Sequence, residues 1–185
     1  MARVEKTDKN RRQLLASMLA AGAAAPVLAQ EQGDEPCKSL SWAVAWKQSA
    51  AEYVALCHQA YNLARLRVDQ KLAQRKTGDR RLAVITDVDD TILHARSYWG
   101  HLINEDKEFF DDAIWDEWLP HNLVTAAPGA IDFFTYCDEQ DVEVFYVTNR
   151  DQGERTFEYA LAQLRHLEFP FADESHLYVF RESSN

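Results

Sequence analysis

The chain has 185 residues, enough for one domain with a hydrophobic core, and a net charge of −10 at pH 7. Without positions 1–29, the remainder holds 15 basic and 28 acidic residues, a net charge of −13, so we expect no nucleic acid polymer as a partner. The three cysteines, Cys37, Cys57 and Cys137, show no metal-ligand spacing, and their disulfide pairing is left open.

Residues 1–29 are predicted to be a signal peptide rather than part of the fold. A basic start with Lys9, Arg11 and Arg12 precedes an Ala- and Leu-rich stretch that ends at Ala29. This stretch is shorter than the about 20 residues that a membrane-spanning helix needs. The arginine pair suggests twin-arginine export, with ordinary secretion as the alternative. We therefore expect a periplasmic or secreted protein that has no stable membrane anchor after signal cleavage.

Residues 30–38 are predicted to be a polar linker, and a long helix is predicted to follow from Ser39. Apolar residues recur at three- and four-residue steps from Trp42 to Leu72, which is the pattern of a helix with one buried face. An aromatic stripe of this kind indicates core packing. The alternative is that part of the stripe forms a wall of a substrate pocket.

Residues 83–91 are a buried-looking apolar run that ends in Asp87-x-Asp89-x-Thr91, which predicts a strand that ends at Asp87 and leads the carboxylates into a loop. Side chains two residues apart in a strand project to the same side, so the two carboxylates repel each other. Such a pair needs a cation, or a task in which one carboxyl stays protonated. A calcium loop of the EF-hand type is excluded because its Gly and Glu are missing. A structural acidic turn is the alternative.

Residues 92–127 lack clean periodicity and are rich in aromatic side chains. Tyr98 and Trp99 are predicted to be exposed near the carboxylates, where their rings could stack on a flat ligand ring. The alternative is that the aromatic residues form a small core of this segment. We favour that alternative for Trp115 and Trp118.

The remaining elements predict an α/β fold with a parallel sheet. A helix is predicted to open at Pro128, a strand to span residues 142–147, and a final strand to span about 176–180. A further helix begins near Asp151. Alternating strands and helices give parallel strands with right-handed crossovers, and the site is expected at the carboxyl ends of the strands.

Small polar residues follow the strand over 142–147 and suggest a phosphate site. Thr148 and Asn149 lead into the predicted helix, whose N-terminus would be capped by Asp151 with Glu154. Free N–H groups and the positive dipole end at that N-terminus can hold a phosphate together with the Thr148 hydroxyl. The alternative is that Thr148 and Asn149 merely cap the turn.

Together these motifs resemble the haloacid dehalogenase (HAD) superfamily, and within it the class C bacterial acid phosphatases of the lipoprotein e type, HAD subfamily IIIB. The segment 87–91 is similar to the first motif, Thr148 to the second, and the stretches 127–130 and 145–150 to further shared segments. The resemblance implies a Rossmann-like HAD core with a parallel sheet and an N-terminal helical extension. The phosphatase domain would span 39–185, with 92–127 as a small cap that determines specificity.

The resemblance also implies a mechanism. Asp87 would be the nucleophile that forms an aspartyl phosphate, and Asp89 the general acid and base. Because an expelled alkoxide needs a proton and an expelled halide does not, Asp89 favours phosphomonoester hydrolysis, with nucleotides as one substrate class. Mg²⁺ would be held by Asp87 and Asp89. A homodimer is left open. The residues expected to bind substrate or its phosphate are Thr148, Asn149, Thr91, Tyr98 and Trp99.

One departure from the resembled group concerns the end of the sequence. That group also uses a Lys and a later acidic cluster, both after a strand like the one at 176–180. Arg181 is the nearest cation here. We therefore expect a C-terminally truncated chain with an incomplete sheet and an exposed edge, inactive by itself. The alternative function is a non-catalytic remnant or a protein that binds a phosphate ligand without turnover.

Overall fold

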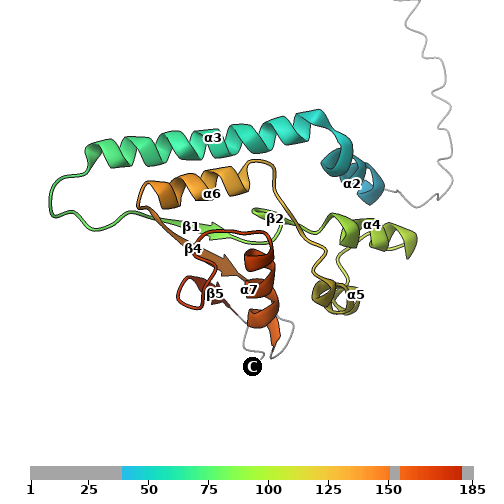
Figure 1. Cartoon of the computed structure of the whole chain (residues 1–185). Helices are drawn as coiled ribbons and strands as arrows, with labels where there is room; N and C mark the ends of the chain where they lie inside the picture. Colours follow the sequence, from blue (N-terminus) through green and yellow to red (C-terminus); the bar gives the residue numbers. More distant parts are fainter. Residues whose placement is uncertain (1–38, 151–154, 181–185) are drawn as a thin grey trace, which may run out of the picture. The chain divides into compact units, whose positions relative to one another are not determined.

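A parallel sheet forms the centre of the computed structural model, which describes residues 39–150 and 155–180. Within these residues the sheet has three strands in the order β1-β4-β5 (Figure 1). They are β1 (Ala83–Asp87), β4 (Glu143–Thr148) and β5 (Leu177–Val179), and both pairings are parallel. The predicted α/β class with a parallel sheet is confirmed. The first strand ends at Asp87, as predicted, and β4 ends at Thr148, one residue beyond its predicted end.

The register of β1 against β4 places the two motifs side by side. Asp87 pairs with Val147, so the β1 carboxyl end lies next to Thr148 at the same edge of the sheet. Val144, Tyr146 and Thr148 alternate as buried residues along β4, the central strand. The loops that carry the predicted site residues therefore leave the sheet beside each other.

The predicted long helix is two helices, α2 (Ser39–Ser49) and α3 (Ala51–Gln74). Ala50 between them has φ −78° and ψ 125°, an extended conformation that ends the helical path. Trp42 and Trp46 are 81% and 45% exposed, so the prediction of one buried aromatic stripe is wrong at its start. The reason is the break, which lets α2 pack against α4 while α3 packs against α6.

Helix α6 (Ala130–Glu139) begins two residues after Pro128, slightly later than predicted. Gly129 precedes it with φ 82°, and a Cβ there would lie 2.8 Å from Nδ1 of His58 on α3. Glycine is thus required both by the backbone conformation and by the close approach of α3. Helix α7 (Thr156–His166) follows β4, and the predicted capping pair lies outside the described residues.

The segment 92–127 is closed at its base by an antiparallel pair of short strands, β2 (Leu93–His94) and β3 (Thr125–Ala126). Between them lie two helices and one 3₁₀ turn that the sequence did not reveal. These are α4 (Arg96–Asn104), α5 (Asp112–Trp118) and η1 (Leu119–His121). Both helices are under three turns long, which is too short for a clear apolar period.

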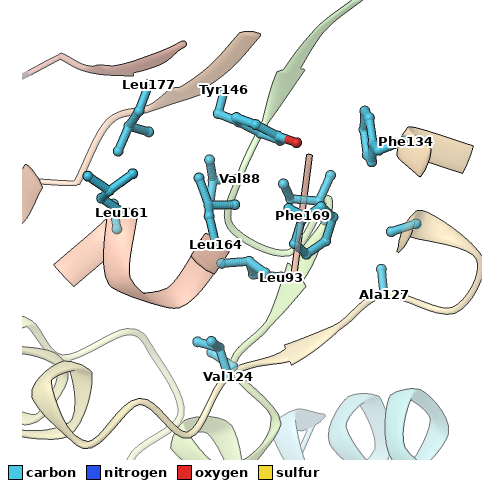
Figure 2. Packing of buried hydrophobic residues seen from close by; sticks show 14 of the residues in the cluster. Val88, Leu93, Val124, Ala127, Phe134, Tyr146, Leu161, Leu164, Phe169 and Leu177 are labelled. Carbon is cyan, nitrogen blue, oxygen red and sulfur yellow. The ribbon is translucent and has the colours of Figure 1, made fainter. Parts of the chain in front are cut away.

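The hydrophobic core packs on one face of the sheet. Figure 2 shows Leu161 and Leu164 of α7 close to Val88 and Leu177, and Phe134 of α6 also belongs to this cluster. On the other face Ile85 is 73% and Tyr178 48% exposed, so β1 is not buried on both faces as its apolar run suggested. Among the described strands β1 lies at a sheet edge.

Within residues 39–150 and 155–180, no helix has the length and apolar character of a membrane span.

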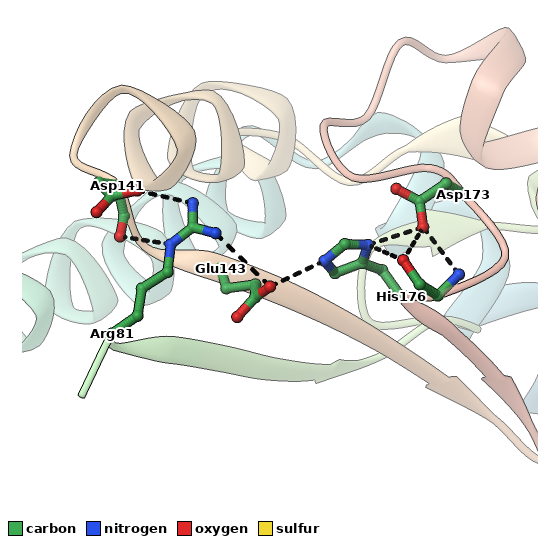
Figure 3. Close-up of polar contacts among 6 residues, drawn as sticks. Arg81, Asp141, Glu143, Asp173 and His176 are labelled. Atoms are coloured by element: carbon green, nitrogen blue, oxygen red, sulfur yellow. Dashed lines mark hydrogen bonds and ion pairs between the residues drawn. The ribbon is translucent and has the colours of Figure 1, made fainter.

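A charged network joins the starting ends of the three strands (Figure 3). Arg81 contacts Asp141 at 2.9 Å and Glu143 at 3.6 Å, and Glu143 also contacts His176 Nε2 at 3.2 Å. Nδ1 of His176 lies 2.8 Å from Asp173. Burial lowers the pKa of His176, but the hydrogen bonds and charges of Asp173 and Glu143 outweigh burial and raise its pKa overall.

The raised pKa of His176 makes part of the stability depend on pH. Its contribution is fully present below the ordinary pKa of histidine and is lost as pH rises through the raised folded-state pKa. We expect His176→Gln to lower the free energy of unfolding at pH 5 more than at pH 9, measured by denaturant unfolding. The control is His101→Gln, on the exposed side of α4. An equal loss at both pH values would contradict this linkage.

Candidate functional site

Asp87 and Asp89 line one cavity of about 380 Å³ at the carboxyl end of β1. Val88 between them is fully buried, so the two carboxylates project away from the core. The cavity volume falls in the range of small-molecule sites. The described residues that line it are Asp87, Asp89, Asp90, Ala95, Trp99, Phe110, Asp112, Trp115, Thr148, Asn149 and Arg150.

The loop after β1 is a tight turn that fixes Asp87. Asp90 adopts a left-handed φ of 53°, and its N–H donates to the Leu93 carbonyl at 2.8 Å. Its carboxylate pairs with Lys47 of α2 at 2.8 Å. Thr91 Oγ1 donates to Asp87 Oδ2 at 2.8 Å. Thr91, predicted to bind substrate, is therefore brought to the Asp87 carboxylate and does not line the cavity itself.

Asp89 is held by a buried arginine. Arg150 Nε donates to Asp89 Oδ2 at 2.8 Å, and Arg150 Nη2 donates to Asp89 Oδ1 at 2.6 Å. The Arg150 side chain is 2% exposed and that of Asp89 35% exposed. From sequence, Arg150 could face phosphate or form an outward salt bridge. The Arg150 side chain instead points inward and pairs with Asp89. Its direction depends on the loop after β1, which lies beside the end of β4 in the fold.

Thr148 and Asn149, which the sequence predicts to bind phosphate, both line the cavity. Thr148 is 1% exposed, and its hydroxyl donates to Asp89 Oδ2 at 3.1 Å. The N–H of Arg150 donates to that hydroxyl at 3.3 Å. The Thr148 hydroxyl therefore bridges the turn after β4 and the Asp89 carboxylate, while Asn149 is exposed at the rim.

Of the two aromatic residues that the sequence predicts beside the carboxylates, Tyr98 differs from its prediction. Its side chain is fully buried; its hydroxyl donates to the Asp111 carbonyl at 3.1 Å and accepts from the Asp111 N–H at 2.9 Å. The predicted exposure of Tyr98 is wrong, because neighbouring positions on α4 point in different directions. Trp99 faces the cavity, while Tyr98 packs against Trp115 and Trp118.

Trp115 and Trp118 are 5% and 7% exposed, so their predicted core role is confirmed. Trp115 also contributes to the cavity lining. Phe110 and Asp112 line the cavity too, although no sequence motif indicated either residue. The cluster of aromatic residues near position 110 could have indicated a cavity wall. It could not indicate in which direction any single side chain points.

The donor chemistry of the site suits Mg²⁺ in kind, because Mg²⁺ prefers carboxylate and carbonyl oxygens together with water. Both side-chain oxygens of Asp89 accept from Arg150, whereas Thr91 engages just one oxygen of Asp87. Asp87 is therefore the better side-chain ligand of the two predicted ones. Within the described residues, no group of three or more His, Cys, Asp or Glu is arranged to hold a metal.

Comparison with known proteins identifies the family of this chain. The pattern of the HAD superfamily, subfamily IIIB (acid phosphatase), matches residues 3–185. The chain belongs to this family. The resemblance drawn from the motifs is thus confirmed.

The class C acid phosphatase from Bacillus anthracis is similar in structure, with a TM-score of 0.69 and 27% sequence identity over 76% of this chain and 57% of that chain. A structure of the Bacillus anthracis enzyme with tungstate bound gives a TM-score of 0.70 and 26% identity, over 79% of this chain and 59% of that chain. The subfamily IIIB chain described here therefore spans less than two thirds of these relatives.

The two hydrogen bonds of the buried Tyr98 hydroxyl predict a structural role. Tyr98→Phe leaves the N–H and carbonyl of Asp111 without this partner, and we expect a loss of about 1–3 kcal/mol in unfolding free energy. Denaturant unfolding measures it. Tyr178→Phe on the exposed face of β5 is the control and should change little. A Tyr98→Phe protein as stable as the wild type would contradict this assignment.

Proposed function

We propose that the protein is an acid phosphatase that hydrolyses small phosphomonoesters through an aspartyl phosphate on Asp87. The observation that carries the proposal is the joint presence of Asp87, Asp89 and Thr148 around one cavity, in a chain of HAD subfamily IIIB. Strand pairing brings Asp87 and Thr148 to the same edge of the sheet. A phosphoryl group bound there would contact both.

The proposed reaction has two steps. An oxygen of Asp87 attacks phosphorus, the bond from phosphorus to the ester oxygen breaks, and Asp89 gives a proton to the departing oxygen. In the second step water attacks the aspartyl phosphate, Asp89 accepts the proton of that water, and phosphate leaves. The hydrogen bond from Thr91 fixes one oxygen of Asp87, which leaves the other for the attack.

The site is strongly acidic, which supports a need for Mg²⁺. Four carboxylates line the cavity, from Asp87, Asp89, Asp90 and Asp112, against the single guanidinium of Arg150 among the described lining residues. A phosphate anion would be repelled by this set unless a cation offsets its charge. Mg²⁺ would be held by the Asp87 carboxylate and the Asp89 backbone carbonyl. When bound, it neutralises charge that develops on the phosphoryl group.

The aromatic residues favour an ester with a flat organic group, such as a nucleotide. Trp99, Phe110 and Trp115 line the same cavity as the carboxylates. A ring that stacks on an aromatic side chain there would leave its phosphate near Asp87. The acidic composition supports a small-molecule substrate rather than a nucleic acid polymer.

Export to the periplasm or the medium is part of the proposal. Its support is the basic start and Ala-rich stretch of residues 1–29, which lie outside the described residues. An exported phosphatase would meet phosphomonoesters outside the cytoplasm, in keeping with a broad scavenging role.

A second candidate function is binding of a phosphate ligand without turnover. The observation that favours it is that both side-chain oxygens of Asp89 accept hydrogen bonds from Arg150, which leaves this carboxylate less free for the proton transfer that turnover needs.

Replacing the nucleophile tests the proposed reaction. We expect Asp87→Asn in the natural full-length protein to lower kcat for 4-nitrophenyl phosphate by roughly 10³-fold or more, because the covalent route is lost. Phosphate release with Mg²⁺ is the measurement, and a chelator should abolish it. Asp79→Asn, in the turn before β1, is the matched control and should retain the wild-type rate.

The two candidate functions are separated by measuring phosphate release and phosphate binding on the natural protein. Binding of phosphate without release would favour the binding function. If the natural protein turns over and Asp87→Asn leaves its rate unchanged, the aspartyl-phosphate mechanism is wrong.

A further inference from the structure

The carboxylate of Asp89 is held by three hydrogen bonds from two residues of the β4 carboxyl end. We propose that Arg150 is the positioning residue that sets the orientation of Asp89, and that Gln163 ties this arrangement to the cap segment 92–127. The inference rests on the proposed phosphatase function and adds residues whose role the reaction itself does not define.

The hydrogen bonds leave one oxygen of Asp89 with room for proton transfer. An ionised carboxylate offers about four acceptor positions, two on each oxygen. Oδ2 accepts from Arg150 Nε at 2.8 Å and from Thr148 Oγ1 at 3.1 Å, whereas Oδ1 accepts from Arg150 Nη2 at 2.6 Å. One position therefore remains on Oδ1. The Asp89 side chain is 35% exposed and lines the cavity, so Oδ1 is assigned as the oxygen that passes the proton.

The guanidinium of Arg150 is itself fixed in orientation. Its Nη1 donates to Gln163 Oε1 at 2.7 Å, and Gln163 Nε2 donates to the Leu119 carbonyl of η1 at 3.2 Å. Arg150 and Gln163 are both buried. The guanidinium also lies 5.9 Å from the ring centre of Trp115. The two hydrogen bonds from the Arg150 guanidinium to Asp89 are called the fork below. Rotation of Arg150 would break buried hydrogen bonds to both Asp89 and Gln163, so the fork is rigid.

This chain of contacts links four separate segments. Leu119 belongs to the cap segment, Gln163 to α7, Arg150 follows β4, and Asp89 follows β1. The cap segment also contributes Trp99 to the cavity. Asp89 and Trp99 are therefore both tied to the cap segment. A leaving group that contacts Trp99 would thus have a fixed position relative to Oδ1 of Asp89.

A purely structural role for the ion pair makes a different prediction from a positioning role. If Arg150 only stabilises the fold, its replacement reduces the rate for every ester by one factor. If Arg150 orients the acid, the loss depends on the leaving group. Phenolate is strongly basic and needs the proton of Asp89, whereas 4-nitrophenolate is weakly basic and departs with little help.

The test is Arg150→Lys in the natural full-length protein, which keeps the positive charge and removes the planar fork. We expect kcat/KM for phenyl phosphate to fall by roughly 10²-fold and that for 4-nitrophenyl phosphate by about 10-fold or less. The ratio kcat/KM is used because it reports phosphoryl transfer to Asp87 and not the later hydrolysis. Arg155→Lys, an exposed arginine paired with Glu158, is the matched control and should change neither value.

A second variant keeps the test decisive if Arg150→Lys does not fold. Gln163→Leu leaves the fork in place and removes its support, so we expect the same leaving-group dependence with smaller losses. Equal factors for both esters, or no loss in either variant, would overturn the positioning role. A wild-type protein that hydrolyses neither ester would instead contradict the proposed function, and the positioning role with it.

Discussion

The parallel pairing of β1 with β4 is the constraint on which the site depends. The register that sets Asp87 beside Val147 brings together two loops whose key residues, Asp89 and Arg150, lie 61 positions apart in the sequence. The fork between these two side chains then joins the loops directly. A buried guanidinium with no partner would be costly, since breaking such a pair is worth about 3–5 kcal/mol. The pairing of the strands and the ion pair therefore support each other.

The two ends of the sheet differ in how their charged side chains are paired. At the starting ends, Arg81, Glu143 and His176 form contacts between strands. At the carboxyl ends, carboxylates gather around a cavity with a single described guanidinium. Repulsion among those carboxylates is tolerated where a cation and a substrate can offset it. The same repulsion is the reason that the proposed binding of a phosphate ester would need a cation such as Mg²⁺.

The sequence was sufficient for the family and for the three strands of the parallel sheet, because these follow from short local patterns. The apolar run before Asp87 and the β-branched run before Thr148 each predict a strand whose end carries polar groups. Directions of single side chains were not predictable in this way. Tyr98 and Trp99 are adjacent and aromatic, yet one is core and the other lines the cavity. The break at Ala50 and the inward turn of Arg150 likewise depend on tertiary neighbours that no local pattern encodes.

Peptide mapping can show whether Asp87 is the nucleophile toward phosphorus. The natural protein would be mixed with a phosphomonoester and Mg²⁺, quenched in acid, digested and analysed by mass spectrometry. We expect one phosphoryl group on the peptide that carries Asp87, and none on that peptide from Asp87→Asn. A phosphoryl group on another residue, or turnover with no phosphorylated peptide under conditions that trap an acyl phosphate, would contradict it.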